Sequence, residues 1–136
     1  MIIRKTTLRD LELFSPSPED IAEAKAYGIE PKLTLNDSMR TVSLYGLPVA
    51  IGGNEGDQVW FVTSANAWRL RAKGKREFRK CIIEYRDLML EKYPVIWNYV
   101  WVGNTHHIRF LKTIGAVFHN EFTGADGQFQ LFTIGG

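Results

Sequence analysis

Cysteine is nearly absent from this sequence of 136 residues, in which Cys81 has no second thiol to pair with. A lone cysteine excludes an internal disulfide, so the fold has to rest on the burial of apolar side chains. No run approaches the roughly 18 consecutive apolar residues that a membrane-spanning helix needs. The first residues, MIIRKTTLRD, lack the long apolar stretch and the cleavage site of a secretory signal. We therefore expect neither a transmembrane segment nor a signal peptide.

Neither sign of charge dominates, because 17 lysine and arginine residues are balanced by 15 aspartate and glutamate residues, for a net charge of +2. Strong nucleic-acid binders carry a larger basic excess, so we expect no strong nucleic-acid binding. Hydrophobic residues make up 45% of the chain, which is enough to build a core without cross-links. We expect a single domain over residues 1–136, without internal repeats or linkers.

Local patterns predict strands interspersed with helices. Runs rich in β-branched and aromatic residues predict strands at 1–7, 41–45, 47–51, 58–63, 95–102, 117–123 and 128–134. Apolar spacing and capping residues predict helices at 8–14 and 18–27, a long helix that ends before Pro94, and a short helix from Asn104 or Thr105 to Ile114. Glycine-rich segments predict turns at 52–57 and 124–127. The predicted order is β-α-α-β-β-β-α-β-α-β-β.

The long helix is the clearest of these elements. Apolar residues recur along it at spacings of three and four, at Phe78, Cys81, Ile82, Tyr85, Leu88 and Met89. A helix that connects two buried strands implies a parallel pair with a right-handed crossover. The remaining strands follow one another closely and are expected to be antiparallel. The predicted fold class is therefore α/β (α+β) with a mixed central sheet.

The turn into the long helix has the sequence Arg69, Leu70, Arg71, Ala72, Lys73, Gly74. This turn and the predicted order of elements together resemble the GNAT family of acetyltransferases. In that family a Q/R-x-x-G-x-G/A motif at the same turn binds the pyrophosphate of acetyl-CoA. Such a site works because the unpaired N–H groups at a helix start attract an anion. A second register starts at Arg71 and places Arg76 last. We favour the first register, which puts Phe78 and Cys81 on the buried face.

The resemblance implies acetyl-CoA or CoA as a possible ligand, although no cofactor is required for the fold. The residues that it implies for binding are Val62, Arg69, Arg71, Ala72, Lys73, Gly74, Lys75, Arg76 and Asn104. Many active members carry a tyrosine seven residues after this asparagine, and the tyrosine protonates the departing thiolate of CoA. This chain has Leu111 at that place. We therefore expect acetyl transfer to be slow or absent.

Longer strings carry a narrower resemblance. SLYGLPVAIGG, EYRDLMLEKY, WNYVWVGNTHHIRFLKTIGAVFH and GQFQLFTI are similar to the internal virion protein A family of T7-like podophages. This resemblance implies a phage protein that assembles the internal components of the virion, with a GNAT-like fold and without an established reaction. It implies other phage internal virion proteins as partners, and the virion interior or the host cytoplasm as location. The alternative is an acetyl-CoA-dependent N-acetyltransferase of unknown acceptor.

The segment 69–80 holds seven basic residues and a single acidic one, Glu77. One interpretation is contact with a phosphate or another polyanion at the start of the long helix. The other is a solvated helix face without a ligand.

Further candidate residues have simpler alternatives. His106, His107 and Glu55 are candidate general bases, but surface, capping and turn roles compete. The two histidines are adjacent and point about 100° apart on a helix, so we predict no metal site. Cys81 is expected to be buried and inert, and Trp68 to be exposed as part of a contact surface.

Overall fold

The computed structural model describes residues 1–124 and 127–136. Its strands are β1 (Ile2–Lys5), β2 (Arg40–Leu44), β3 (Leu47–Glu55), β4 (Gln58–Thr63), β5 (Val95–Trp101), β6 (Val117–Gly124) and β7 (Phe129–Gly135). Its helices are α1 (Leu8–Leu13), α2 (Pro18–Tyr27), the short 3-10 helix η1 (Ala67–Arg69), α3 (Ala72–Lys92) and α4 (Thr105–Thr113). The predicted order of elements is confirmed. The turn predicted at 124–127 includes Ala125 and Asp126, which lie outside the described residues.

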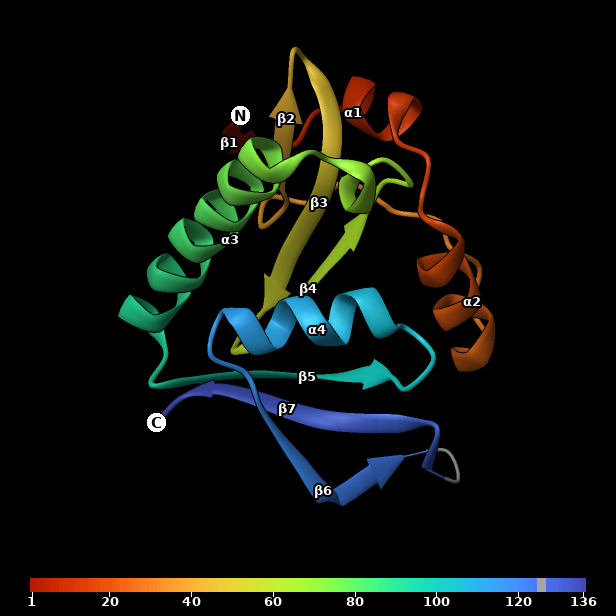
Figure 1. Ribbon diagram of the computed structural model, residues 1–136, viewed down its shortest axis with the longest axis vertical. Helices are drawn as coiled ribbons and strands as arrows, with labels where there is room; N and C mark the ends of the chain where they lie inside the picture. The colour runs from red at the N-terminus through yellow and green to blue at the C-terminus, as the bar shows by residue number, and fades with distance from the viewer. Residues whose placement is uncertain (125–126) are drawn as a thin grey trace.

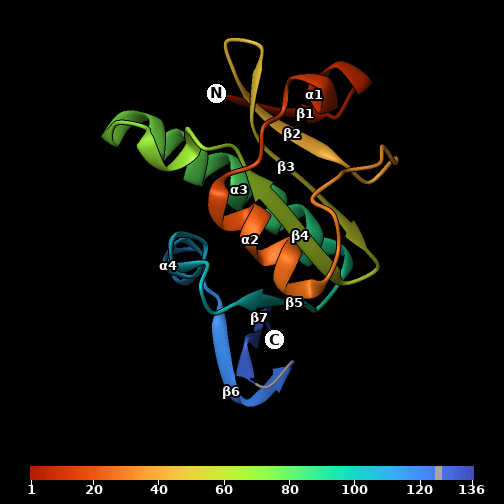
Figure 2. The same ribbon diagram turned by 90° about the vertical axis from the view of Figure 1, so that its right-hand side faces the viewer.

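All seven strands form one mixed sheet in the order β1-β2-β3-β4-β5-β7-β6. The connection through α3 makes β4 and β5 parallel, as predicted, and every other neighbouring pair is antiparallel. Figure 1 shows α3 and α2 at opposite sides of the molecule, with α4 lying along β5. In Figure 2, β4 crosses in front of α3, so this helix lies behind the sheet in that view.

The parallel pair in the middle of the sheet is open along most of its length. A single pair of residues, Gln58 and Trp97, joins β4 to β5 in register. By contrast, β5 pairs with β7 at every residue from Val95 to Trp101. The sheet therefore consists of two well-paired halves that separate beyond one point of contact.

Side chains of α2 hold these two halves at the open end. Asp20 Oδ2 accepts hydrogen bonds from Thr63 N at 2.7 Å and from Thr63 Oγ1 at 3.0 Å. Glu23 Oε1 accepts from Trp101 N at 2.7 Å. Because Thr63 ends β4 and Trp101 ends β5, one turn of α2 sets the separation of the two strands. Asn98 Nδ2 donates to Val59 O at 2.8 Å nearer the closed end.

The sequence of α2 explains how Asp20 reaches this place. Ser17 caps the helix, since its Oγ accepts from Asp20 N at 3.2 Å, and Pro18 follows at the first helical position. Gly28 ends the helix with a φ of 77°, a left-handed conformation that favours glycine. The capping residues therefore fix where α2 begins and which of its faces meets the sheet.

The turn predicted at 52–57 is shorter than expected, because β3 continues to Glu55. Gly52 pairs with Phe61 and Gly53 with Trp60. A Cβ atom on Gly52 would lie 2.7 Å from the carbonyl oxygen of Trp60, which is closer than such atoms approach. These glycines thus allow close packing inside a hairpin and do not mark its turn.

The core forms where the apolar face of α3 meets the sheet. Phe78, Cys81, Ile82 and Met89 are buried, as predicted. Leu88 is not, because its side chain is 47% exposed. Adjacent helical residues point about 100° apart, so the burial of Met89 turns Leu88 towards the edge of the stripe.

We predict that Phe78→Ala lowers the free energy of unfolding by about 3–5 kcal/mol, because Phe78 is 2% exposed and its removal leaves a cavity. The matched change Leu88→Ala on the same helix should cost about 0.5 kcal/mol. Urea unfolding followed by circular dichroism measures both. Equal losses for the two variants would contradict the packing described for α3.

We predict that Asp20→Asn destabilises the fold in a pH-dependent way. Burial alone would raise the pKa of the Asp20 carboxyl, but His107 and the donors of Thr63 and Asn104 outweigh it and hold the pKa below the usual 3.8. The ionised carboxylate therefore stabilises the folded state above about pH 4, and this contribution is lost as the pH falls further. In the asparagine variant, each buried donor left without an acceptor costs about 1–3 kcal/mol.

Urea unfolding of both proteins between pH 7 and pH 3 measures this contribution. The difference in the free energy of unfolding between wild type and Asp20→Asn should shrink as the pH falls. The other carboxylates should contribute the same pH dependence to both proteins. A difference that stays constant over this range would contradict an ionised Asp20 in the folded protein.

Candidate functional site

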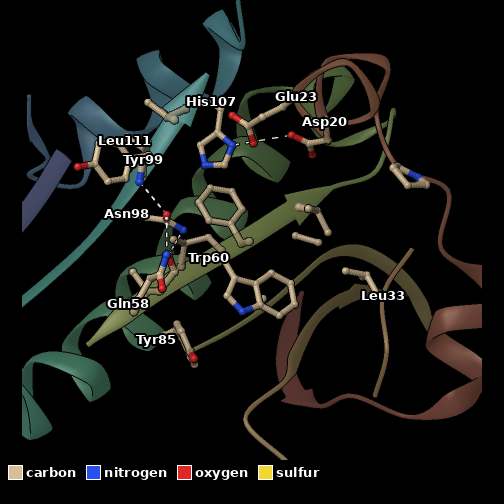
Figure 3. Close-up of a pocket in the computed structure, with 18 of the residues that line it drawn as sticks. Asp20, Glu23, Leu33, Gln58, Trp60, Tyr85, Asn98, Tyr99, His107 and Leu111 are labelled. Carbon is tan, nitrogen blue, oxygen red and sulfur yellow. Dashed lines mark hydrogen bonds and ion pairs between the residues drawn. The ribbon is translucent and has the colours of Figure 1, made fainter. Parts of the chain in front are cut away.

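The separation of β4 from β5 opens a cavity of about 480 Å³ (Figure 3). Its walls come from both strands, from α2, α3 and α4, and from the coil at 29–33. Most of the lining is apolar, with Val42, Ala50, Ile82, Ile96 and Leu111 among the buried residues. Polar side chains gather at two separate ends of it, as Figure 3 shows.

One end holds Asp20, Glu23 and His107. His107 is 6% exposed, and its Nδ1 lies 3.9 Å from Asp20 Oδ1, too far for a direct hydrogen bond. Within the described residues, this buried nitrogen has no hydrogen-bond partner. Burial raises the pKa of the Glu23 carboxyl, although the bond from Trp101 N opposes the shift. The end of the cavity near α2 therefore combines an ionised carboxylate with a second one that gains a proton more readily.

At the other end, beside Glu55, neutral polar groups form hydrogen bonds to one another. Gln58 Nε2 donates to Asn98 Oδ1 at 3.2 Å, and Tyr99 N donates to the same oxygen at 2.7 Å. Tyr85 Oη donates to Asn54 Oδ1 at 3.3 Å. These amides close the cavity where β4 and β5 meet.

The candidate general bases predicted from the sequence are not brought together. Glu55 and His107 both line the cavity, but Glu55 is exposed at the end of β3. The side chain of His106 is 46% exposed and lies 3.3 Å from Glu19 Oε1, outside the cavity lining. His107 instead faces Asp20. Asp20 and Glu23 lie within the helix predicted at 18–27, but the sequence patterns assigned neither residue a functional role, since only tertiary contacts place both beside the strands.

Most residues of the predicted coenzyme motif lie away from the cavity. Val62 lines it, whereas the motif residues at the start of α3 do not. The exposed members of this group are Arg69, Arg71, Ala72, Lys73, Lys75 and Arg76. Gly74 is half-buried, and a Cβ atom on it would meet Leu70 Cβ at 3.2 Å, so its bare Cα packs on the chain itself. The N-cap residue Arg71 forms no side-chain cap.

Asn104 was predicted as a helix cap and as a coenzyme ligand, but its side chain has a different partner. It is 1% exposed, makes no cap hydrogen bond, and donates from Nδ2 to Asp20 Oδ1 at 2.8 Å. Leu111 lines the cavity and is 2% exposed. The place of the expected proton donor is thus occupied by a buried aliphatic side chain.

Trp68 is half-buried in a cluster of rings, and the prediction that it is exposed is wrong. Its ring lies 5.7 Å from Phe110, 5.9 Å from Phe78 and 5.7 Å from His106, centroid to centroid. Phe61 continues the cluster to the cavity, 5.8 Å from Phe110 and 4.2 Å from His107. Because rings at 4.5–7 Å attract one another, Trp68 stabilises the packing of α4 on η1 and α3.

Over residues 1–124 and 127–136, no group of three His, Cys, Asp or Glu side chains is arranged to hold a metal ion. None of the helices in this part of the chain combines the length and the apolar character needed to span a membrane.

The fold has well-defined structural relatives. The chain is similar to an acetyltransferase from Agrobacterium tumefaciens, with a TM-score of 0.64 and 14% identity over 98% of this chain and 90% of that one. It is similar to the GNAT domain of S. lividans PAT, with a TM-score of 0.66 and 12% identity over 97% and 88%. The ribosomal-protein-S18-alanine N-acetyltransferase from Escherichia coli gives 0.57 and 12% over 97% and 91%. At such low identities these relatives show the fold alone, which is GNAT-like.

Sequence comparison identifies a much nearer relative. The chain is 66% identical over 134 residues to the probable scaffold protein gp13 of Escherichia phage T7, covering 98% of this chain and 96% of that protein. The family described as "Bacteriophage T7, probable scaffold protein Gp13" matches residues 38–123. That span includes β2 to β5 and all of β6 but its last residue, and therefore both strands that border the cavity. The chain therefore belongs to the T7 Gp13 probable scaffold protein family, and it carries that family's sequence on a GNAT-like fold.

Proposed function

We propose that this protein is a phage assembly factor that acts through protein contacts and not through acetyl transfer. The observation that carries the proposal is the 66% identity, over nearly the whole chain, to a phage protein named a probable scaffold protein. Within that role, the protein organises the internal proteins of the virion while the particle is built in the host cytoplasm. This finer assignment rests on the resemblance to the internal virion protein A family and not on the chemistry of a site.

The cavity supports a role without catalysis. Acetyltransferases of this fold commonly protonate the departing thiolate from a tyrosine at the place of Leu111, and one general acid is worth roughly 10²–10⁴-fold in rate. Leu111 is buried and has no proton to donate. The alternative, an acetyl-CoA-dependent N-acetyltransferase, would need another donor near that point of the cavity.

The start of α3 offers a surface for a protein partner. Residues 69–80 carry seven basic residues and one acidic residue, a charge of +6, whereas the remaining 10 basic and 14 acidic residues give −4. All seven basic residues of this basic surface are exposed. Within residues 1–124 and 127–136, no carboxylate lies within 4.0 Å of their charged nitrogens. Charge complementarity therefore favours an acidic segment as its partner.

A protein segment fits this surface better than DNA does. From Arg71 to Lys80 the helix rises by about 14 Å. Duplex DNA carries one negative charge per roughly 1.7 Å and continues past both ends of such a patch, where it meets a body of charge −4. A short acidic segment covers the basic surface without that repulsion.

We predict that a phage lacking this gene forms heads but packages its internal proteins incompletely. The assembly role requires this result, because the other internal proteins would lose a contact during their incorporation. Gel analysis of purified particles and plaque counts, with the gene supplied from a plasmid as control, measure the effect. A full internal protein complement with normal infectivity would refute the assembly role.

We predict that Lys73→Glu with Arg76→Glu reduces complementation of that deletion at least tenfold, because two exposed charges of the basic surface are reversed. The matched control, Arg9→Glu with Lys25→Glu, changes the net charge equally at exposed residues elsewhere. Circular dichroism verifies that both variants fold. Equal complementation by the two variants would exclude the basic surface as the contact while leaving the assembly role intact.

A further inference from the structure

If this chain bound CoA as GNAT acetyltransferases do, its structure would need an open path for the coenzyme. In that family the coenzyme binds with its pyrophosphate at the start of the long helix and with its thiol near the residue that corresponds to Leu111. A bound CoA would therefore have to run from the start of α3 into the cavity that Leu111 lines. Its pantetheine arm, which connects these two ends, needs an open path between α3, β4 and α4.

The ring cluster lies across that path. Trp68 belongs to η1, directly before α3, and Phe78 lies in the second turn of α3. Phe110 comes from α4 and contacts both, with its centroid 5.2 Å from that of Phe78. Phe61 from β4 contacts Phe110 and also lines the cavity. The rings thus form an unbroken series from the helix start to the cavity wall.

These contacts leave no gap between neighbouring rings of the cluster. Ring centroids 5.2–5.9 Å apart correspond to direct van der Waals contact between neighbouring rings. An aliphatic arm inserted between two such rings would need about 3.5–4.0 Å of carbon–carbon separation on each side. The start of α3 is suited to a phosphate, with exposed Lys73 and Arg76, and the packed rings of Trp68, Phe78 and Phe110 follow directly beyond it.

We propose that Phe61, Trp68, Phe78 and Phe110 form an aromatic wall that closes the coenzyme groove of this fold and separates the start of α3 from the cavity. The residues that match the GNAT motifs support the same conclusion. Asn104 is 1% exposed and its Nδ2 donates to Asp20, and the bare Cα of Gly74 packs on Leu70. The residues present therefore do not fit CoA as one bound molecule. This inference is independent of the proposed assembly role.

The consequence is specific and measurable. CoA should bind wild type no more tightly than 3′-phosphoadenosine 5′-diphosphate, its nucleotide half including the pyrophosphate, since the pantetheine arm gains no contacts. Pantetheine alone should not bind. Opening the wall should make pantetheine and CoA bind more tightly, and it should leave the affinity for the nucleotide half unchanged.

Isothermal titration calorimetry tests the wall with these three ligands at up to millimolar concentration. The proteins are wild type, the single variant Trp68→Leu, and a double variant that combines Trp68→Ala with Phe110→Ala. In wild type we expect the dissociation constants of CoA and of the nucleotide half to agree within threefold. Binding of both ligands below detection also meets this expectation. In at least one wall variant we expect CoA to bind at least tenfold more tightly than in wild type. Trp68→Leu is the milder change, because Trp68 is only half-buried. If the double variant fails to fold, the single variant alone tests the wall.

Two results would overturn the proposal. The first is wild-type binding of CoA at least tenfold tighter than the nucleotide half, which would mean that the arm reaches the cavity. The second is a wall variant that is folded by circular dichroism yet binds neither CoA nor pantetheine more tightly than wild type. Leu88→Ala, a change on the exposed side of α3, is the control and should behave as wild type with all three ligands.

Discussion

Two carboxylates on one turn of α2 keep the central strands of the sheet apart. Parallel strands in the middle of a sheet ordinarily satisfy one another's backbone groups, but here Asp20 accepts from the end of β4 and Glu23 from the end of β5. Because each carboxylate replaces a missing partner strand, the opening carries no penalty of unpaired N–H groups at those ends. The cavity, the burial of His107 and the orientation of Asn104 all follow from this arrangement.

The elements of the fold could be predicted because their signals are local. Helix caps, apolar spacing and turn residues lie within a few residues of one another, so capping residues located the helix at 18–27 and the apolar stripe located α3. The errors arose where packing decides, as at Leu88, or where glycines such as Gly52 serve a neighbouring strand. The site could not be predicted in the same way. Asp20 meets Thr63 across 43 residues and Glu23 meets Trp101 across 78, and no pattern within either segment announces the contact.

The residues that match the GNAT motifs have different surroundings in this chain. The start of α3 has the basic residues and small residues that phosphate binding requires, and the helix after β5 begins with the expected asparagine. Yet that asparagine is buried against Asp20, and a leucine stands where a proton donor would be needed. The GNAT-like fold is thus present, while Asn104 and Leu111 are buried and the basic residues at the start of α3 are exposed. A shared fold does not determine the chemistry of a site, because fold and function depend on different residues.

The single pair between Gln58 and Trp97 also has a mechanical meaning. It acts as a pivot, since the two halves of the sheet are internally well paired and meet in register there alone. Thr63 lies five residues further along β4, which places the carboxylate contacts roughly 17 Å from the pivot at about 3.3 Å per residue. At that lever arm, a rotation of a few degrees moves the strand ends by about 1 Å, enough to break a hydrogen bond. Asp20 and Glu23 therefore oppose such a rotation at the far end of the arm, from a helix that belongs to neither half.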